Sequence, residues 1–341
     1  KHCNGTRIAT KWSTMADHAR AFWVTKPGHG EIRTEELPPL GKEDLVIRAL
    51  FSGISRGTES LVFHGQVPLS ERTRMRAPFQ VGEFPAPVKY GYASVGYVEH
   101  GPDNLKDRSV FVLYPHQTRY VVPANAVHPL PQDLTPGRAV LAANLETAIN
   151  GLWDSKLNIG DHVTVIGAGT VGCLTAWLVV NILGCTVELV DINTNRSKVA
   201  QTLGVQFAEP NTATPNADAV FHVSGSPGGL ELALKLAGIE STIVELSWFG
   251  EQTVPLPLGQ DFHAKRLTIT SSQVGRISPT QRPRWNTHRR LQLALRLLAD
   301  PVLDTLITAE SDFEMLPQVM AKLANSPGDT LCHRIKYPSS I

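Results

Sequence analysis

Cysteine is scarce in this sequence, and the cysteines present are not spaced for a common role. The 341 residues contain four, and none of them forms a C-x-x-C pair: Cys3, Cys173, Cys185 and Cys332. A disulfide framework and a cysteine-rich zinc lobe are therefore not predicted. Reduced thiols in a cytoplasmic protein are the ordinary interpretation of such scattered cysteines.

Long apolar runs and an excess of one charge are also missing. The longest apolar run, residues 173–183, is interrupted by Asn181, whereas a membrane-spanning helix needs about 20 residues. Lys and Arg number 32 and Asp and Glu 31, which argues against a nucleic-acid-binding surface over the whole protein. Residues 1–14 lack the apolar core of a signal peptide and are expected to form a disordered leader. We therefore predict a soluble cytoplasmic protein with no membrane or nucleic-acid partner.

Two patterns of secondary structure divide the remaining chain. Between residues 15 and 135, short β runs such as 44–51 and 93–98 are separated by Pro and Gly, which predicts a barrel-like β domain. Between residues 144 and 275, strands and helices alternate, which predicts a parallel sheet. Amphipathic helices at 289–298 and 316–323 and a final strand follow. A chain of this length is expected to form two domains.

A glycine-rich turn carries the clearest functional signal. The segment HVTVIGAGTVG at 162–172 joins a predicted strand to a predicted helix, and Asp191 ends the next strand. This combination is the fingerprint of a dinucleotide-binding unit. Its glycines are expected to allow the tight turn, the approach of a pyrophosphate and close helix packing: Gly167, Gly169 and Gly172. Free N–H groups at the helix start are expected to receive the phosphates: Thr170, Val171 and Gly172.

Asp191 indicates which dinucleotide is bound. Its carboxylate is expected to accept hydrogen bonds from the adenosine ribose and to repel a 2′-phosphate, which favours NAD(H) over NADP(H). Two alternatives remain: Asp191 caps the next helix, or Arg196 accommodates a 2′-phosphate rather than lying in solvent. Further cofactor contacts are expected from the loops that follow the strands, where ordinary turns are the alternative: Ile192, Asn193, Ser224, Gly225 and Ser247.

Further motifs give the chain a family resemblance. GISRGTE at 53–59, KYGYASVGYV at 89–98 and LETAINGLW at 145–153 accompany the glycine-rich turn. With these motifs the chain, from about residue 20 onward, resembles the medium-chain dehydrogenase/reductase (alcohol dehydrogenase-like) superfamily. The resemblance implies an α/β fold with a β-rich, GroES-like catalytic domain over 15–143 and 276–341. It also implies a doubly wound, parallel-sheet Rossmann domain over 144–275 and a homodimer.

The zinc ligands of that superfamily are replaced in this sequence. Ser55 stands where the resemblance places a zinc-binding cysteine, Tyr92 where it places a histidine, and Ala93 at the adjoining glutamate. Glu146 matches a carboxylate ligand of the polyol-dehydrogenase branch. Because Ser and Tyr are poor zinc ligands beside thiolate and imidazole, we predict no metal. The pattern is similar to a zinc-free branch that includes the bacteriochlorophyllide hydroxyethyl dehydrogenases.

Without zinc, a side chain must polarise or protonate the substrate oxygen. Tyr92 is the first candidate because a phenol can donate a proton; alternatively it fills the emptied metal cavity. Glu146 is either a general base or a buried carboxylate paired with Arg56 or a backbone amide. Ser55, Thr58 and Glu59 complete the candidate catalytic set, although Glu59 also suits the dipole of a helix N-terminus.

Other residues near these motifs carry secondary predictions. The resemblance assigns Arg56 to the cofactor pyrophosphate, and Gly57 replaces the proton-relay hydroxyl of the zinc enzymes. His64 and His116 are either acid–base groups or structural histidines. A basic cluster either receives an anionic substrate or forms a solvated helix edge: Arg276, Arg282, Arg284, Arg289 and Arg290, with Arg72, Arg74 and Arg76.

The leading functional prediction is a zinc-independent, NAD(H)-dependent oxidoreductase that acts on an alcohol or carbonyl group of a small molecule. An NADPH-dependent quinone or enoyl reductase is the first alternative. A protein that binds the cofactor without catalysis is the second. Fold resemblance alone does not decide among these.

Overall fold

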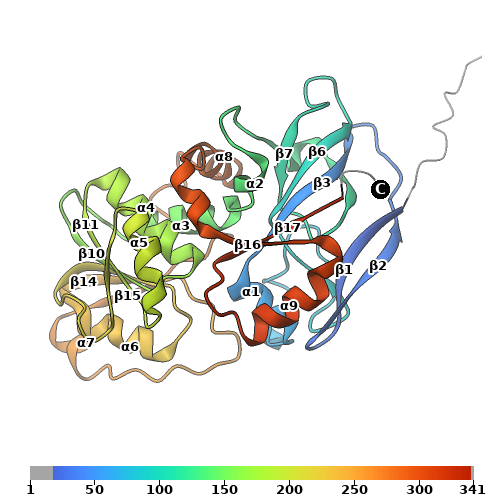
Figure 1. Cartoon of the computed structure of the whole chain (residues 1–341). Coiled ribbons are helices and arrows are strands. Elements are labelled where there is room, and N and C mark those ends of the chain that lie inside the picture. Colours follow the sequence, from blue (N-terminus) through green and yellow to red (C-terminus); the bar gives the residue numbers. More distant parts are fainter. Residues whose placement is uncertain (1–17, 339–341) are drawn as a thin grey trace, which may run out of the picture.

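The computed structural model describes residues 18–338, so the expected leader at 1–14 lies outside the described residues. Within the described part, the strands form three sheets. Figure 1 shows a parallel sheet with its helices at one end of the molecule and the β-rich part at the other. No helix in the described part has the length and apolar character needed to cross a bilayer.

The smallest sheet has the order β2-β1-β5-β4. Strands β1 (His18–Lys26) and β2 (His29–Glu36) form an antiparallel hairpin, and Gly28 supplies its positive φ of 76° at the turn. Strands β5 (Val88–Lys89) and β4 (Val81–Gly82) extend it. Both lie in the stretch after residue 63, where the sequence shows only an irregular run of Pro, Arg and Glu.

The seven-stranded sheet includes the last strand of the described residues. Its order is β16-β17-β3-β6-β7-β9, with β8 paired to β3. Strand β17 runs antiparallel to β3, so a C-terminal segment pairs with the strand that begins at residue 44 (Figure 1). Its strands are β3 (Asp44–Ile54), β6 (Ser94–His100), β7 (Ser109–Val112), β8 (Arg119–Pro123), β9 (His128–Pro129), β16 (Ile307–Asp312) and β17 (Cys332–Lys336).

The six-stranded sheet is parallel throughout, as the alternating pattern predicts. In its order, β12-β11-β10-β13-β14-β15, successive strands of the chain are added on one side of β10 as far as β12 and then on its other side from β13 onward. Ligands of such sheets bind at this reversal, beyond the carboxyl ends of the strands. The strands are β10 (His162–Ile166), β11 (Thr186–Val190), β12 (Gln206–Ala208), β13 (Ala217–His222), β14 (Ala237–Glu245) and β15 (Thr268–Ser271).

Helices cover this sheet and connect it to the β-rich part. The apolar residues of β10 pack against α4 in a core that also includes α3 and the buried face of α8. On the other side of the molecule, α1 and α9 pack together. The longer helices are α1 (Arg56–Phe63), α3 (Ala142–Asp154), α4 (Thr170–Leu183), α5 (Ser197–Thr202), α6 (Pro227–Leu236), α8 (Thr287–Leu297) and α9 (Leu316–Asn325).

Short helical turns complete the described elements. They are η1 (Leu69–Glu71), η2 (Ala124–Ala126), α2 (Pro136–Ala139), η3 (Thr194–Arg196), α7 (Asp261–Ala264), η4 (Pro301–Leu306) and η5 (Phe313–Met315). Strand β16 was not predicted, because its residues are mostly polar.

Candidate functional site

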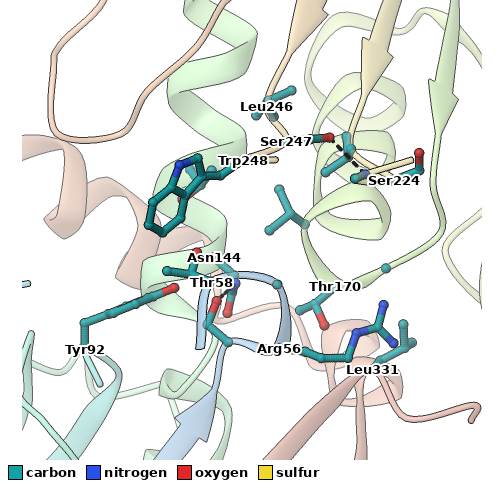
Figure 2. Close-up of a pocket in the computed structure, with 17 residues that line it drawn as sticks. Arg56, Thr58, Tyr92, Asn144, Thr170, Ser224, Leu246, Ser247, Trp248 and Leu331 are labelled. Atoms are coloured by element: carbon teal, nitrogen blue, oxygen red, sulfur yellow. Dashed lines mark hydrogen bonds between the residues drawn. The ribbon is translucent and has the colours of Figure 1, made fainter. Parts of the chain in front are cut away.

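A cavity of about 210 Å³ lies where α1, α3, the start of α4 and the loops after β13 and β14 meet. Figure 2 shows Tyr92 and Trp248 on one side of this cavity and Arg56 beside Thr170 on the other. Four of its lining residues besides Tyr92 carry hydroxyl or amide groups and come from the start of α1 or from α3: Ser55, Thr58, Asn144 and Thr147. The cavity therefore joins Tyr92, Ser55 and Thr58 to the glycine-rich turn.

The glycine-rich turn has the geometry that the sequence predicts. Gly167 has a φ of 109°, and a Cβ there would lie 2.7 Å from the Ser224 backbone. A Cβ at Gly172 would overlap the carbonyl oxygen of Gly167, so helix and strand approach each other only because both residues are glycines. Gly169 stands just before α4, and beside its missing Cβ lies only the Arg56 Nη2 atom, at 4.0 Å. This opening, at the positive end of a helix, suits an anionic group.

Arg56 reaches this opening from the first turn of α1. Its Nη1 donates a hydrogen bond to the Thr330 carbonyl over 3.3 Å. Burial lowers the Arg56 pKa and the nearby Arg196 lowers it further, whereas Asp191 raises it. The charges of Arg56 and Arg196 thus repel each other, and a bound anion would relieve this repulsion.

The Arg196 side chain is buried rather than solvated, and its Nη1 donates to the Asp329 carbonyl over 2.8 Å. A second cavity, of about 530 Å³, is lined by Asp191 and Ile192. The interpretation of Arg196 as a solvated residue is therefore wrong, whereas its role toward a 2′-phosphate stays a prediction. Asp329 also accepts hydrogen bonds from the side chains of Asn193 and Asn195, over 2.6 and 2.9 Å.

Asp191 organises the loop at the end of β11. Its Oδ2 accepts the Ala168 N–H over 2.6 Å, and its Oδ1 accepts the Asn193 N–H over 2.8 Å. The alternative that Asp191 caps the next helix is not what the structure shows, because Asn193 accepts the Asn195 N–H at the start of that turn. Each carboxylate oxygen can accept more than one hydrogen bond. Asp191 can therefore still receive a ribose hydroxyl from the second cavity.

Tyr92 lies between β5 and β6, and its hydroxyl points toward Thr58 in the cavity (Figure 2). Burial and, to a smaller extent, the charge of Glu59 raise its pKa to about 12, although hydrogen bonding to the side chains of Ser55 and Thr58 acts in the opposite direction. The phenol therefore keeps its proton at neutral pH. Asn144 Nδ2 donates to the Ser55 hydroxyl over 3.3 Å.

Glu59 is buried behind this cavity rather than lining it. Its Oε1 accepts the Ser55 N–H over 2.8 Å, which closes the first turn of α1. Its Oε2 lies 2.8 Å from Nε2 of His116, which is also buried. His64, by contrast, bonds the Ala324 carbonyl on α9. Gly57 offers no hydroxyl, but the next residue, Thr58, places one beside Tyr92.

Glu146 faces away from the cavity and is paired with an unexpected partner. Arg290 Nε donates to Glu146 Oε1 over 3.0 Å, and both side chains are buried. The expected pairing with Arg56 is therefore wrong, because Glu146 lies on the face of α3 that packs against α8. Burial raises the Glu146 pKa, while Arg290 lowers it. This position gives Glu146 no access to a substrate in the cavity.

Among the arginines of the basic cluster between residues 276 and 290, only Arg290 departs from the interpretation as a solvated helix edge, since the others are exposed. Arg290 is the largest fully buried side chain in the described part, and it also donates to Asn150 and to the Val274 carbonyl. Arg289 remains exposed and lies over the Trp285 ring, at 4.1 Å from its centroid. Arg76 forms an ion pair with Glu83 at 2.8 Å, and Arg74 pairs with Glu71.

The sequence did not reveal a polar chain that links the two loops after β13 and β14. His222 Nδ1 lies 2.6 Å from Glu245 Oε2, and His222 Nε2 lies 2.7 Å from the Ser224 hydroxyl. Glu245 Oε1 also accepts the Ser247 N–H over 2.6 Å. The Gly225 N–H donates to the Ser247 hydroxyl over 3.0 Å, the bond drawn in Figure 2. The sequence contained one signal for this chain: a histidine ends one predicted strand and a glutamate lies at the end of the next.

The donor atoms at the replaced zinc positions do not suit a zinc ion. Ser55 and Tyr92 offer hydroxyl oxygens, Ala93 offers no ligand, and Glu146 is turned toward Arg290. Among residues 18–338, no three His, Cys, Asp or Glu side chains are grouped closely enough to hold a metal ion. Zinc strongly prefers thiolate, imidazole and carboxylate ligands.

No protein-family model matches the chain. Among curated proteins, 2-dehydro-3-deoxy-L-galactonate 5-dehydrogenase of Pseudoalteromonas atlantica is 27% identical over 186 residues, or 51% of this chain and 54% of that protein. The chain thus spans about half the length of this curated relative.

Two solved structures are similar over nearly the whole chain. The alcohol dehydrogenase RspB of Escherichia coli CFT073, in complex with NADH, has a TM-score of 0.75 at 16% identity and covers 94% of this chain and 100% of that one. A dehydrogenase of the zinc-binding type from Sinorhizobium meliloti 1021, bound to NADP, has a TM-score of 0.75 at 17% identity and covers 94% and 99%.

These similarities establish the predicted fold class, an α/β fold of the kind found in medium-chain alcohol dehydrogenase structures. The relatives and structural neighbours are dehydrogenases of that zinc-type class, and the two neighbours described above hold different nicotinamide dinucleotides. At these identities the structural match defines the fold, and the activity must be argued from the site.

Proposed function

We propose that this protein is a zinc-independent, NAD(H)-dependent oxidoreductase that interconverts an alcohol and its carbonyl compound. The observation that carries the proposal is the position of Tyr92. Its protonated phenol lines the same cavity as the glycine-rich turn and stands where the resemblance places a metal ligand. A proton donor thus replaces the Lewis acid of the zinc enzymes, in agreement with the resemblance to a zinc-free branch.

The residues present fit a nicotinamide dinucleotide. The opening beside Gly169, the free N–H groups at the start of α4 and Arg56 would hold the pyrophosphate. Asp191 lines the second cavity, where its charge would accept ribose hydroxyls and repel a 2′-phosphate. Ser224 lines both cavities and Ser247 lines the smaller one, so both would contact the cofactor. When bound, the nicotinamide supplies or accepts the hydride at the reacting carbon.

Tyr92 then handles the proton. In carbonyl reduction, its hydroxyl donates a proton to the substrate oxygen, and the phenolate left behind accepts hydrogen bonds from Ser55 and Thr58. In alcohol oxidation the same proton returns to the phenolate. Because its pKa is raised to about 12, Tyr92 acts more readily as a donor than as a base at neutral pH.

The substrate class follows from the cavity and from the relative. Hydroxyl and amide groups line the cavity beside the Trp248 ring, which suits a molecule with several hydroxyl groups and an apolar face. The curated relative is named for a sugar-acid substrate. We therefore expect a secondary alcohol or ketone on a polyhydroxylated chain. The homodimer and the cytoplasmic location implied by the sequence remain predictions.

Substitution of the donor tests the proposal. Tyr92→Phe is expected to reduce turnover of a polyol or ketose substrate by about 100-fold or more, the usual contribution of a general acid, while NADH affinity is retained. Tyr90→Phe is the matched control, because Tyr90 packs against Tyr92 at 5.9 Å between ring centroids without lining the cavity. Full activity of Tyr92→Phe would reject Tyr92 as the donor. One equivalent of zinc in the purified active protein would reject zinc independence.

A further inference from the structure

A line of four buried polar side chains lies behind Tyr92. Glu59 Oε2 is 2.8 Å from His116 Nε2, His116 Nδ1 is 2.7 Å from the Ser52 hydroxyl, and Ser52 is 2.9 Å from the Tyr337 hydroxyl. Each of these side chains is less than a tenth exposed. Burying a carboxylate and an imidazole costs free energy unless the two groups are hydrogen-bonded, and here the four side chains bond one another.

The fold brings these groups together from four separate segments. Each side chain comes from a different place: Glu59 from the first turn of α1, His116 from the loop between β7 and β8, Ser52 from β3, and Tyr337 from the position directly after β17. The His116 carbonyl accepts the Phe22 N–H over 2.9 Å, which fixes the loop to β1.

Gly91, directly before Tyr92, leaves room for the imidazole. It has a φ of 131°, and a Cβ there would lie 2.9 Å from His116 Cδ2. The backbone beside Tyr92 is therefore in close contact with the His116 ring.

We propose that Glu59 and His116 form a dyad whose charge controls how readily Tyr92 releases its proton. Both are positioning residues in this sense, because they act on Tyr92 and touch neither substrate nor cofactor. The inference rests on the proposed function only in taking Tyr92 as the proton donor.

The Glu59 carboxylate places one negative charge near Tyr92 and opposes formation of the phenolate, and the effect is strong because the site is buried. His116 holds this carboxylate in place through the contact of 2.8 Å between Nε2 and Oε2. The raised pKa of Tyr92, caused by burial and then by Glu59, agrees with this direction.

The other titratable groups that the dyad faces come from two places. Tyr90 and Tyr92 lie in the segment between β5 and β6, and burial raises the pKa of Tyr90 while Tyr92 and Glu59 raise it further. Cys332 and Tyr337 lie on and just after β17, and Glu59 acts to raise the pKa of both. These groups are all neutral at physiological pH. Among these described groups, the Glu59 carboxylate thus supplies the charge beside Tyr92.

Fluorine NMR of a site-specific 3-fluorotyrosine at position 92 measures the effect without any turnover. We expect Glu59→Gln to lower the apparent pKa of this fluorophenol by about one unit or more, the size of shift that one nearby charge produces. Glu35→Gln is the matched control, since Glu35 pairs with Lys89 and acts on Tyr114 rather than on Tyr92. An unchanged ionisation at position 92 in Glu59→Gln would overturn the proposal.

A second variant keeps the proposal testable if Glu59→Gln does not fold. In His116→Gln the Glu59 carboxylate loses the imidazole that holds it, so its charge is less compensated and the apparent pKa of the fluorophenol at position 92 is expected to rise. KM for the cofactor should stay unchanged, whereas a purely structural role would lower kcat without changing this ionisation. An identical ionisation at position 92 with and without His116→Gln would contradict the proposal. Full activity of Tyr92→Phe would reject the donor role instead and leave the fluorine result to decide on the dyad.

Discussion

His222 and Glu245 end neighbouring parallel strands in register, and their side chains meet at 2.6 Å between Nδ1 and Oε2. Through Ser224 and Ser247 this pair fixes both loops that border the smaller cavity. The polar chain therefore sets the shape of the wall that a nicotinamide would touch.

The first prediction concerns this pair. His222→Asn is expected to weaken NADH binding by about tenfold, or about 1.4 kcal/mol, because Ser224 and Glu245 lose a common partner and the two loops loosen. Calorimetric titration with NADH measures the change. His64→Asn is the control, since His64 contacts the Ala324 carbonyl away from both cavities. Equal affinities in His222→Asn and wild type would show that the pair has no part in ordering the site.

A second prediction concerns cofactor choice. Asp191→Asn removes the charge but keeps an acceptor for one of the two backbone N–H groups that Asp191 holds. We expect the preference for NADH over NADPH to fall by about tenfold or more, since a 2′-phosphate would no longer meet a carboxylate. Parallel titrations with the two dinucleotides give the ratio. If the ratio does not change, Asp191 does not select the cofactor.

The buried Glu146–Arg290 pair leads to a third prediction, about stability. Arg290→Met leaves Glu146 buried without its partner and is expected to cost about 3–5 kcal/mol in the free energy of unfolding. Adding Glu146→Leu should recover part of that loss. Urea denaturation of both single variants and the double variant measures the coupling. Strictly additive effects would mean that the two residues do not stabilise each other.

The fourth prediction concerns pH. Because Tyr92 has a pKa raised to about 12, its proton is present throughout the working range. Alcohol oxidation needs the phenolate, so its rate is expected to rise with pH up to that value, while the Tyr92 proton does not limit carbonyl reduction in the same range. The raised pKa of Tyr92 also contributes to the free energy of unfolding. It favours the folded state below about pH 10, and this contribution is lost as the pH rises toward 12.

This prediction is checked by measuring the rates of alcohol oxidation and of carbonyl reduction as a function of pH, from about pH 6 to the onset of unfolding. Tyr92→Phe serves as the reference, because it removes the group while the cavity keeps its shape. An oxidation rate that does not change with pH in the wild type would contradict the assigned role.

A fifth prediction addresses the glycine-rich turn. Gly172→Ala places a methyl group against the Gly167 carbonyl and is expected to abolish dinucleotide binding, since helix and strand must separate. Gly259→Ala is the control, because its Cβ would meet nothing within 4 Å. Fluorescence titration with NADH distinguishes the two variants. Normal binding by Gly172→Ala would show that the close packing at this turn is not required.

The sequence was sufficient to predict features that depend on neighbouring residues, but not which residues distant in sequence form ion pairs. The glycine-rich turn could be recognised because its requirements are set by neighbouring residues, and the structure shows the same close contacts between Gly167 and Gly172. The partner of Glu146 could not be recognised, because Arg290 lies 144 residues further along the chain. Nothing near either residue in sequence indicates that α3 and α8 face each other.

The same reason explains the two histidines. His116 meets Glu59 only because β3, α1 and the loop after β7 converge behind Tyr92, and His222 meets Glu245 only because β13 and β14 are neighbours in the sheet. A single histidine in a sequence has many possible environments. Only the three-dimensional arrangement shows which carboxylate each histidine meets.

Arg56 and the glycine-rich turn belong to different halves of the molecule, one to α1 beside the seven-stranded sheet and the other to the parallel sheet. A dinucleotide held between them would touch both halves at once, so its binding energy would be shared with the interface that joins them. Saturation with cofactor should therefore merge the melting of the two halves into a single, later transition. Bound cofactor would then hold the two halves together reversibly. The protein without cofactor would therefore be cleaved more readily by a protease.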